Sequence, residues 1–130
     1  MSYHFTVTLD CGFEDAIEKA TSALKEKGFG VLTTIDVQKA MKEKIDEDIR
    51  PYTILGACSP RHAFKAIQAE NKIGTMLPCN VLVQENEAGK MEVSIVDPAA
   101  SMAAIDNADL GALAMEVRDL LESVAADLAA

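Results

Sequence analysis

Two of the three cysteines stand at positions where a thiol could do chemistry. Cys58 ends an apolar, strand-like stretch and is followed by Ser59-Pro60, a pair typical of a helix start. A thiol at a helix N-terminus feels the positive end of the helix dipole, and Arg61 and His62 add positive charge nearby, so we expect a lowered pKa at Cys58. The resulting thiolate is the form that serves as a nucleophile, a redox group or a soft-metal ligand.

Cys79 lies where the following strand should begin, and it is the natural partner of Cys58. If these two strands run antiparallel, the end of one and the start of the other share one end of the sheet, and the two sulfurs could meet. If the strands run parallel, the sulfurs lie at opposite ends and the pair is a coincidence. The alternative use of both thiols is structural, because cysteine is among the most buried residue types.

Other kinds of chemistry have weaker support in the sequence. There is no Cys-x-x-Cys, and Cys58 with His62 supplies too few ligands for a closed zinc site, so we expect no metal. No spacing pairs two carboxylates for acid–base work, and no glycine-rich loop could cradle a phosphate. Ser59 lacks the glycines of a nucleophile elbow. We therefore expect no cofactor.

Periodicity predicts the elements that must position these residues. Alternating or β-branched stretches predict strands over residues 3–9, 29–35, 52–57, 80–85 and 91–97, the last two forming a hairpin around the turn that contains Gly89. Apolar residues at helical spacing predict helices over 13–27, from Asp36 as a cap to 45, over 60–70, and from Asn107 as a cap onward. The third of these should be capped by Ser59 and bury Ala63, Phe64 and Ile67.

Strands and helices in this order predict one α+β domain over residues 1–130. We expect a mainly antiparallel or mixed sheet of about five strands with helices largely on one face. The last helix carries a wide apolar stripe, which core packing explains and which could also form a dimer.

Composition excludes several classes of function. The net charge of −9 repels phosphate backbones and anionic lipid headgroups, which argues against nucleic acid and membrane as partners. Apolar runs fall far short of the roughly 20 residues of a membrane-spanning helix. Three cysteines, an odd count, and a start that already reads as a strand favour the reducing cytoplasm.

Three motifs in order make the chain resemble the domain-of-unknown-function family numbered 302. The motifs are GFGVL (28–32) leading into Ile35-Asp36, ILGACSP (54–60) followed by Ala63, and Ile73-Gly74 followed by LPCNV (77–81). The resemblance covers nearly the whole chain and implies a bacterial or archaeal α+β protein that forms homodimers and has no established reaction. Family members usually carry Asn where this chain has Ser59, and either residue can cap a helix.

These observations leave three functional hypotheses. The first is a ligand-binding or sensing module with a pocket at the Cys58/Cys79 sheet edge, where Ser59, the helix N-terminus, His62, Asn80 and Asp36 would meet a small anionic or sulfur-containing ligand. The second is a thiol-dependent redox enzyme with Cys58 as nucleophile and Cys79 as resolving thiol. The third is a structural or oligomerisation domain that acts through the last helix.

Overall fold

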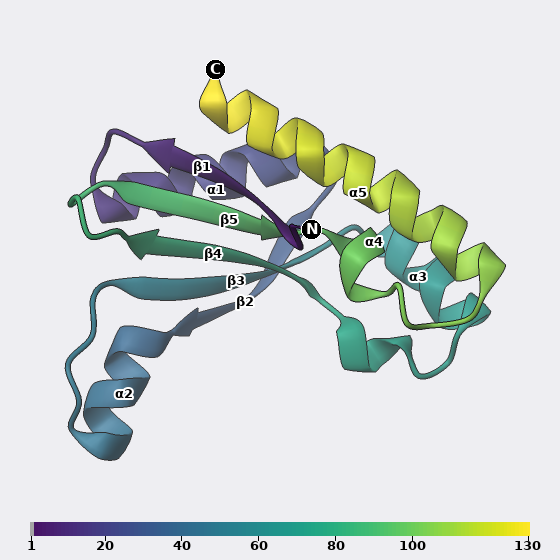
Figure 1. Ribbon diagram of the computed structural model, residues 1–130, viewed down its shortest axis with the longest axis horizontal. Helices are drawn as coiled ribbons and strands as arrows, with labels where there is room; N and C mark the ends of the chain where they lie inside the picture. Colours follow the sequence, from purple (N-terminus) through teal and green to yellow (C-terminus); the bar gives the residue numbers. More distant parts are fainter. Residues whose placement is uncertain (1) are drawn as a thin grey trace.

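The computed structural model describes residues 2–130 as one five-stranded antiparallel sheet with helices on one face and beyond its ends (Figure 1). The strand order is β1-β5-β4-β3-β2, and every neighbouring pair is antiparallel, which confirms the expected α+β class. The strands are β1 (His4–Leu9), β2 (Gly30–Asp36), β3 (Tyr52–Cys58), β4 (Cys79–Glu85) and β5 (Met91–Val96).

The register of β3 and β4 decides how the two cysteines relate. Ala57 of β3 lies opposite Cys79 of β4, so Cys58 is one residue beyond the position that faces Cys79. The antiparallel arrangement that the cysteine hypothesis required is therefore present.

One face of the sheet forms the core. Alternate residues of the central strands are buried there, as the period-two pattern predicts, among them Leu55, Val81, Val83, Val93 and Ile95. Helices α1 (Phe13–Glu26) and α5 (Ala108–Ala129) cover this face and contact each other. Burial of the apolar stripe of α5 shows that this stripe serves as core packing.

The remaining helices lie past the ends of the strands. Helices α3 (Pro60–Ala69) and α4 (Pro98–Ser101) pack against α5 near the end of the sheet where β4 starts, and a short 3₁₀ helix, η1 (Ile73–Met76), links α3 to β4. Helix α2 (Val37–Ile45) stands at the opposite end, next to the corner formed by β2 and β3 (Figure 1). No residue of α2 is fully buried.

The helix caps agree with the sequence in two places and differ in one. Asp36 accepts a hydrogen bond from the backbone N–H of Lys39, and Asn107 accepts one from Leu110, as expected. Ser59 occupies the cap position of α3, but its hydroxyl makes no capping hydrogen bond to the backbone. The expectation that Ser59 caps the helix through its side chain is wrong.

Helix α3 also buries a different face from the one expected. Ala66 is buried and Ala63 half-buried, but Phe64 and Ile67 are 64% and 51% exposed. Ala66 belongs to the apolar cluster that includes Leu110 and Ala114 of α5, so the small side chain, and not Phe64 or Ile67, lies on the buried face of α3.

Gly56 of β3 sits where no side chain fits. A Cβ at this position would lie 2.7 Å from Cγ of Pro78 and closer still to Oγ1 of Thr33. The missing side chain lets the segment that leads into β4 cross directly over β3, and so helps to set the position of Cys79.

Candidate functional site

A small cavity lies between the end of the sheet, α3 and the N-terminal half of α5. Its volume is about 40 Å³, and almost all of its wall is apolar. The cavity is lined by Phe29, Ala57, Cys58, Ser59, His62, Ala63, Ala66, Leu77, Pro78, Cys79, Pro98, Met102, Leu110, Leu113, Ala114 and Val117.

The lining residues differ in burial, which shows the side on which the cavity opens. Phe29, Ala57 and Leu110 are buried and form its floor. Ser59 and His62 at the start of α3 are half-buried, as are Leu77, Pro78 and Leu113, so the start of α3 forms part of the opening.

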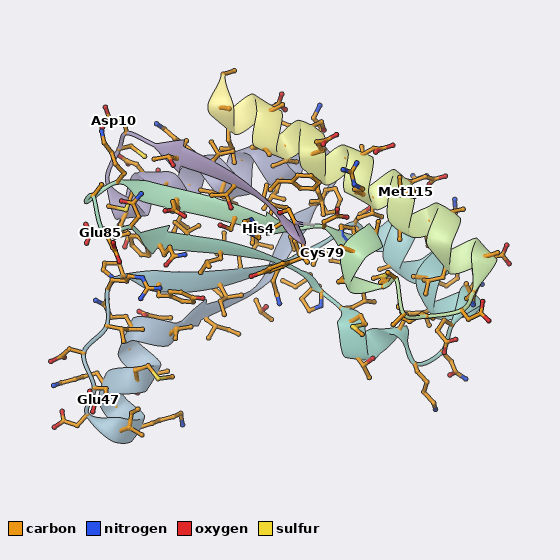
Figure 2. All side chains as sticks on the ribbon, viewed as in Figure 1. His4, Asp10, Glu47, Cys79, Glu85 and Met115 are labelled. Atoms are coloured by element: carbon orange, nitrogen blue, oxygen red, sulfur yellow. The ribbon has the colours of Figure 1, made fainter. Side chains whose placement is uncertain are left out.

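Four of the six residues expected at the site line this cavity: Cys58, Cys79, Ser59 and His62. Figure 2 shows Cys79 at the end of β4 nearer α3 and α4, far from Glu47 beyond the opposite end of the sheet. Two wider surface depressions, of about 480 and 510 Å³, contain none of the six.

Asn80 and Asp36 do not belong to the site. Asn80 follows Cys79 on β4 and is exposed, because neighbouring residues of a strand point to opposite faces of the sheet. Asp36 pairs with Thr53, whereas Cys58 pairs with Gly30 at the other end of the same strand pair. The expectation that these two side chains share a pocket with the cysteines is wrong.

Both thiols are held in the neutral form. Burial raises the pKa of Cys58 above its ordinary value. Burial, and to a smaller degree the neighbouring Cys58, raises the pKa of Cys79 from 9.0 to about 11. The expected lowering of the Cys58 pKa by the helix N-terminus is wrong, because desolvation by burial raises this pKa.

The two cysteines are neighbours at one end of the sheet. Ala57 lies directly opposite Cys79, so Cys58 is one residue beyond that position, and both cysteines line the cavity. Both are free thiols. Neither has the lowered pKa that a reactive thiolate requires, because burial raises the pKa of each.

Polar groups at the opening form a chain of contacts that the sequence did not reveal. Oγ of Ser59 lies 2.7 Å from Nδ1 of His62, and Nε2 of the same ring lies 3.5 Å from Oε2 of Glu116 on α5. A serine followed three residues later by a polar residue at a helix start was a signal for the first contact. Only the packing of α3 against α5 reveals the second.

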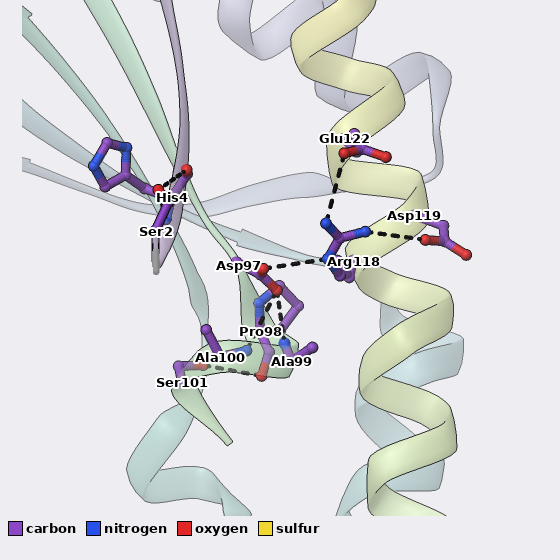
Figure 3. Close-up of polar contacts among 10 residues, drawn as sticks. All are labelled: Ser2, His4, Asp97, Pro98, Ala99, Ala100, Ser101, Arg118, Asp119 and Glu122. Atoms are coloured by element: carbon purple, nitrogen blue, oxygen red, sulfur yellow. Dashed lines mark hydrogen bonds and ion pairs between the residues drawn. The ribbon is translucent and has the colours of Figure 1, made fainter. Parts of the chain in front are cut away.

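A part-buried ion pair ties the α4 side of the cavity to α5. Asp97, at the end of β5, accepts hydrogen bonds from the backbone N–H groups of Ala99 and Ala100, and its Oδ2 lies 3.2 Å from Nε of Arg118 (Figure 3). Pro98 and Val117, the neighbours of this pair in sequence, line the cavity. The ion pair therefore links the two segments that supply these lining residues.

Among residues 2–130, no three His, Cys, Asp or Glu side chains are arranged to hold a metal ion. Within the same residues, no helix has both the length and the apolar character needed to cross a membrane.

The fold and site define a small α+β protein with an apolar cavity that has a serine and a histidine of a helix start at its opening. The chain belongs to the family described as domain of unknown function DUF302, whose model matches residues 5–128. It is similar to an uncharacterized conserved DUF302 protein from Bacillus stearothermophilus, whose crystal structure superimposes with a TM-score of 0.91 at 25% sequence identity, with both chains covered completely. No curated protein matches the sequence.

Proposed function

We propose that this protein is a ligand-binding or sensing module and that its ligand enters the cavity beside Cys58 and Cys79. The observation that supports this most is the convergence of four residues, chosen for their chemistry, on one apolar cavity: Cys58, Cys79, Ser59 and His62. An apolar cavity with a few polar groups at one end is the usual form of a small-molecule site.

The walls favour an uncharged ligand over an anionic one. Glu116 faces His62 at the opening, and the chain carries a net charge of −9, so an anion would meet repulsion as well as apolar walls. Between the two expected ligand classes, we therefore favour a neutral sulfur-containing molecule. Neutral thiols and Met102 along the wall make favourable contacts with such a polarizable group.

The size of the cavity limits the part of the ligand that is enclosed. A water molecule needs roughly 10–15 Å³ of this volume, so the 40 Å³ cavity encloses about three heavy atoms. The rest of a larger ligand would extend past Ser59 and His62 into solvent.

A thermal-shift series tests this proposal. Dimethyl sulfide, a neutral compound of three heavy atoms, is expected to raise the melting temperature in proportion to its binding, whereas acetate is not. Ala114→Val on the cavity wall should abolish the shift by filling the space. Ala126→Val, an exposed site on the same helix, should preserve the shift. A shift that Ala114→Val leaves unchanged would place binding elsewhere and refute the proposal.

The competing hypotheses have less support. A thiol-dependent enzyme requires a reactive thiolate, and burial raises the pKa of both Cys58 and Cys79. An oligomerisation domain that acts through the last helix has little apolar surface left there, because the stripe is already packed against α1 and the sheet. A homodimer in the cytoplasm remains our proposal, with exposed apolar residues such as Phe64 and Ile67 available for the contact.

A further inference from the structure

We infer that Ser59 is an acyl-accepting nucleophile, activated by His62, and that the substrate is a compound with a short activated acyl group, such as an acetyl ester or thioester. The inference rests on the proposed function, because the acyl group would occupy the cavity. It goes further in assigning a reaction to the polar groups at the opening.

The contacts of His62 set the direction of proton transfer. The Glu116 carboxylate, 3.5 Å from Nε2, favours the tautomer with its proton on Nε2. Nδ1 then has a free lone pair, and at 2.7 Å it accepts the hydroxyl proton of Ser59. Serine, histidine and a carboxylate in contact in this order can activate a serine whatever the fold around them, although here Nδ1 faces the serine and Nε2 the carboxylate, the reverse of the usual arrangement.

The start of α3 supplies what the absent nucleophile elbow would otherwise provide. Because Ser59 does not use its hydroxyl as a cap, that hydroxyl remains available to His62 and to the cavity. Within residues 2–130, the backbone N–H groups of Arg61 and His62 have no intramolecular acceptor, as is normal for the first turn of a helix. Such N–H groups stabilise an oxyanion when a carbonyl carbon is attacked.

The cavity selects the acyl group by size. An acetyl group has three heavy atoms, which matches the number that about 40 Å³ encloses. Its carbonyl would lie beside Ser59 at the opening, and the alcohol or thiol portion would remain outside.

The reaction proceeds in two steps, acylation of Ser59 and hydrolysis of the acyl-serine. Oγ of Ser59 bonds to the carbonyl carbon, its proton passes to Nδ1 of His62, and the bond from carbon to the leaving oxygen or sulfur breaks as that atom takes the proton. Water then attacks the acyl-serine, again with His62 accepting and returning the proton. The products are a carboxylic acid and an alcohol or thiol.

Incubation with p-nitrophenyl acetate, followed by mass spectrometry of the peptides, tests the inference. We expect an acetyl group on Ser59 and a burst of p-nitrophenolate. Ser59→Ala should abolish both, and His62→Gln should slow acylation by at least ~100-fold. Ser101→Ala, a matched control at an exposed serine of α4, should behave as the unaltered protein does.

The thermal shift with dimethyl sulfide, measured on the same samples, separates the two proposals. A shift without acetyl-Ser59 overturns the nucleophile and leaves the binding module standing. An acetyl group found on Cys58 or Cys79 also overturns the assignment to Ser59. If neither a shift nor an adduct is observed, both proposals fail.

Discussion

The buried thiol of Cys79 should make the stability of the protein depend on alkaline pH. Its pKa is about 11 in the folded protein, against 9.0 for an ordinary thiol. In the unfolded chain the thiol ionises first, so between these two values the unfolded state binds fewer protons and stability falls as the pH rises. Well below pH 9 the thiol is neutral in both states, and its contribution is fully present.

The size of the effect follows from the same two values. Since each tenfold difference in proton affinity corresponds to 1.36 kcal/mol, the free energy of unfolding should decrease by at most about 3 kcal/mol between pH 8 and pH 11 because of Cys79. Cys79 as a residue is only 9% exposed, so solvent screens this effect little. Cys58, whose pKa is also raised, adds a loss of the same sign.

Urea unfolding of the natural chain and of Cys79→Ala, at intervals from pH 7 to pH 11, measures this contribution. Groups other than the coupled Cys58 titrate equally in both proteins, so the difference between the two curves reports the thiol of Cys79 together with its effect on Cys58. We expect a difference that is constant up to about pH 8.5 and then changes by ~2–3 kcal/mol in favour of Cys79→Ala. Parallel curves across the whole range would refute the account of Cys79 as a desolvated neutral thiol, and would return the thiol-dependent enzyme to consideration.

Three further predictions concern stability and assembly. Gly56→Ala should lower the free energy of unfolding by about 1–3 kcal/mol through overpacking, measured by urea unfolding, and Gly74→Ala, which has open space around it, should not. Asp97→Asn keeps the hydrogen bonds that cap α4 but removes the charge that faces Arg118, so we expect the free energy of unfolding to fall by about 1–2 kcal/mol in the same assay. The control Asp127→Asn, at an exposed ion pair, should change the free energy of unfolding by less than about 0.5 kcal/mol. Size-exclusion chromatography with light scattering should give twice the chain mass of 13.9 kDa, and a strict monomer at all concentrations would contradict the homodimer.

The bounds of the strands and of the longer helices were predictable from local patterns to within one or two residues, whereas the order and direction of the strands were not. Strand alternation and helical spacing report which face is buried, and these periods are visible in stretches such as residues 91–97 and 107–130. Burial inside α3 was less predictable, because Phe64 and Ile67 have the same spacing as a buried stripe. Ala66 forms the contact with α5 in their place, and its small side chain carries a weak hydrophobic signal.

The part of the candidate site that consists of neighbours in sequence was predictable. The part that depends on contacts between distant elements was not. Cys58, Ser59 and His62 lie in one short stretch, and strand direction brought Cys79 to them. The contact between His62 and Glu116 depends on how α3 packs against α5, which no local pattern records. Desolvation of the thiols could not be predicted from the sequence for the same reason, because the walls that exclude water come from several elements of the chain.

The pairing of β1 with β5 has a consequence for how the chain acquires its structure during synthesis. His4 pairs with Val96, so the first strand made has no partner in the sheet until most of the chain has left the ribosome. The core face of β1 remains uncovered for longer still, until α5 has also been synthesised. Contacts this distant in sequence form slowly, and an apolar strand left unpaired is prone to aggregation. Strands β2 to β5 each pair with the next strand in sequence and can form early. We nevertheless expect chains truncated before α5 to depend on chaperones to remain unaggregated, because the core face is then uncovered.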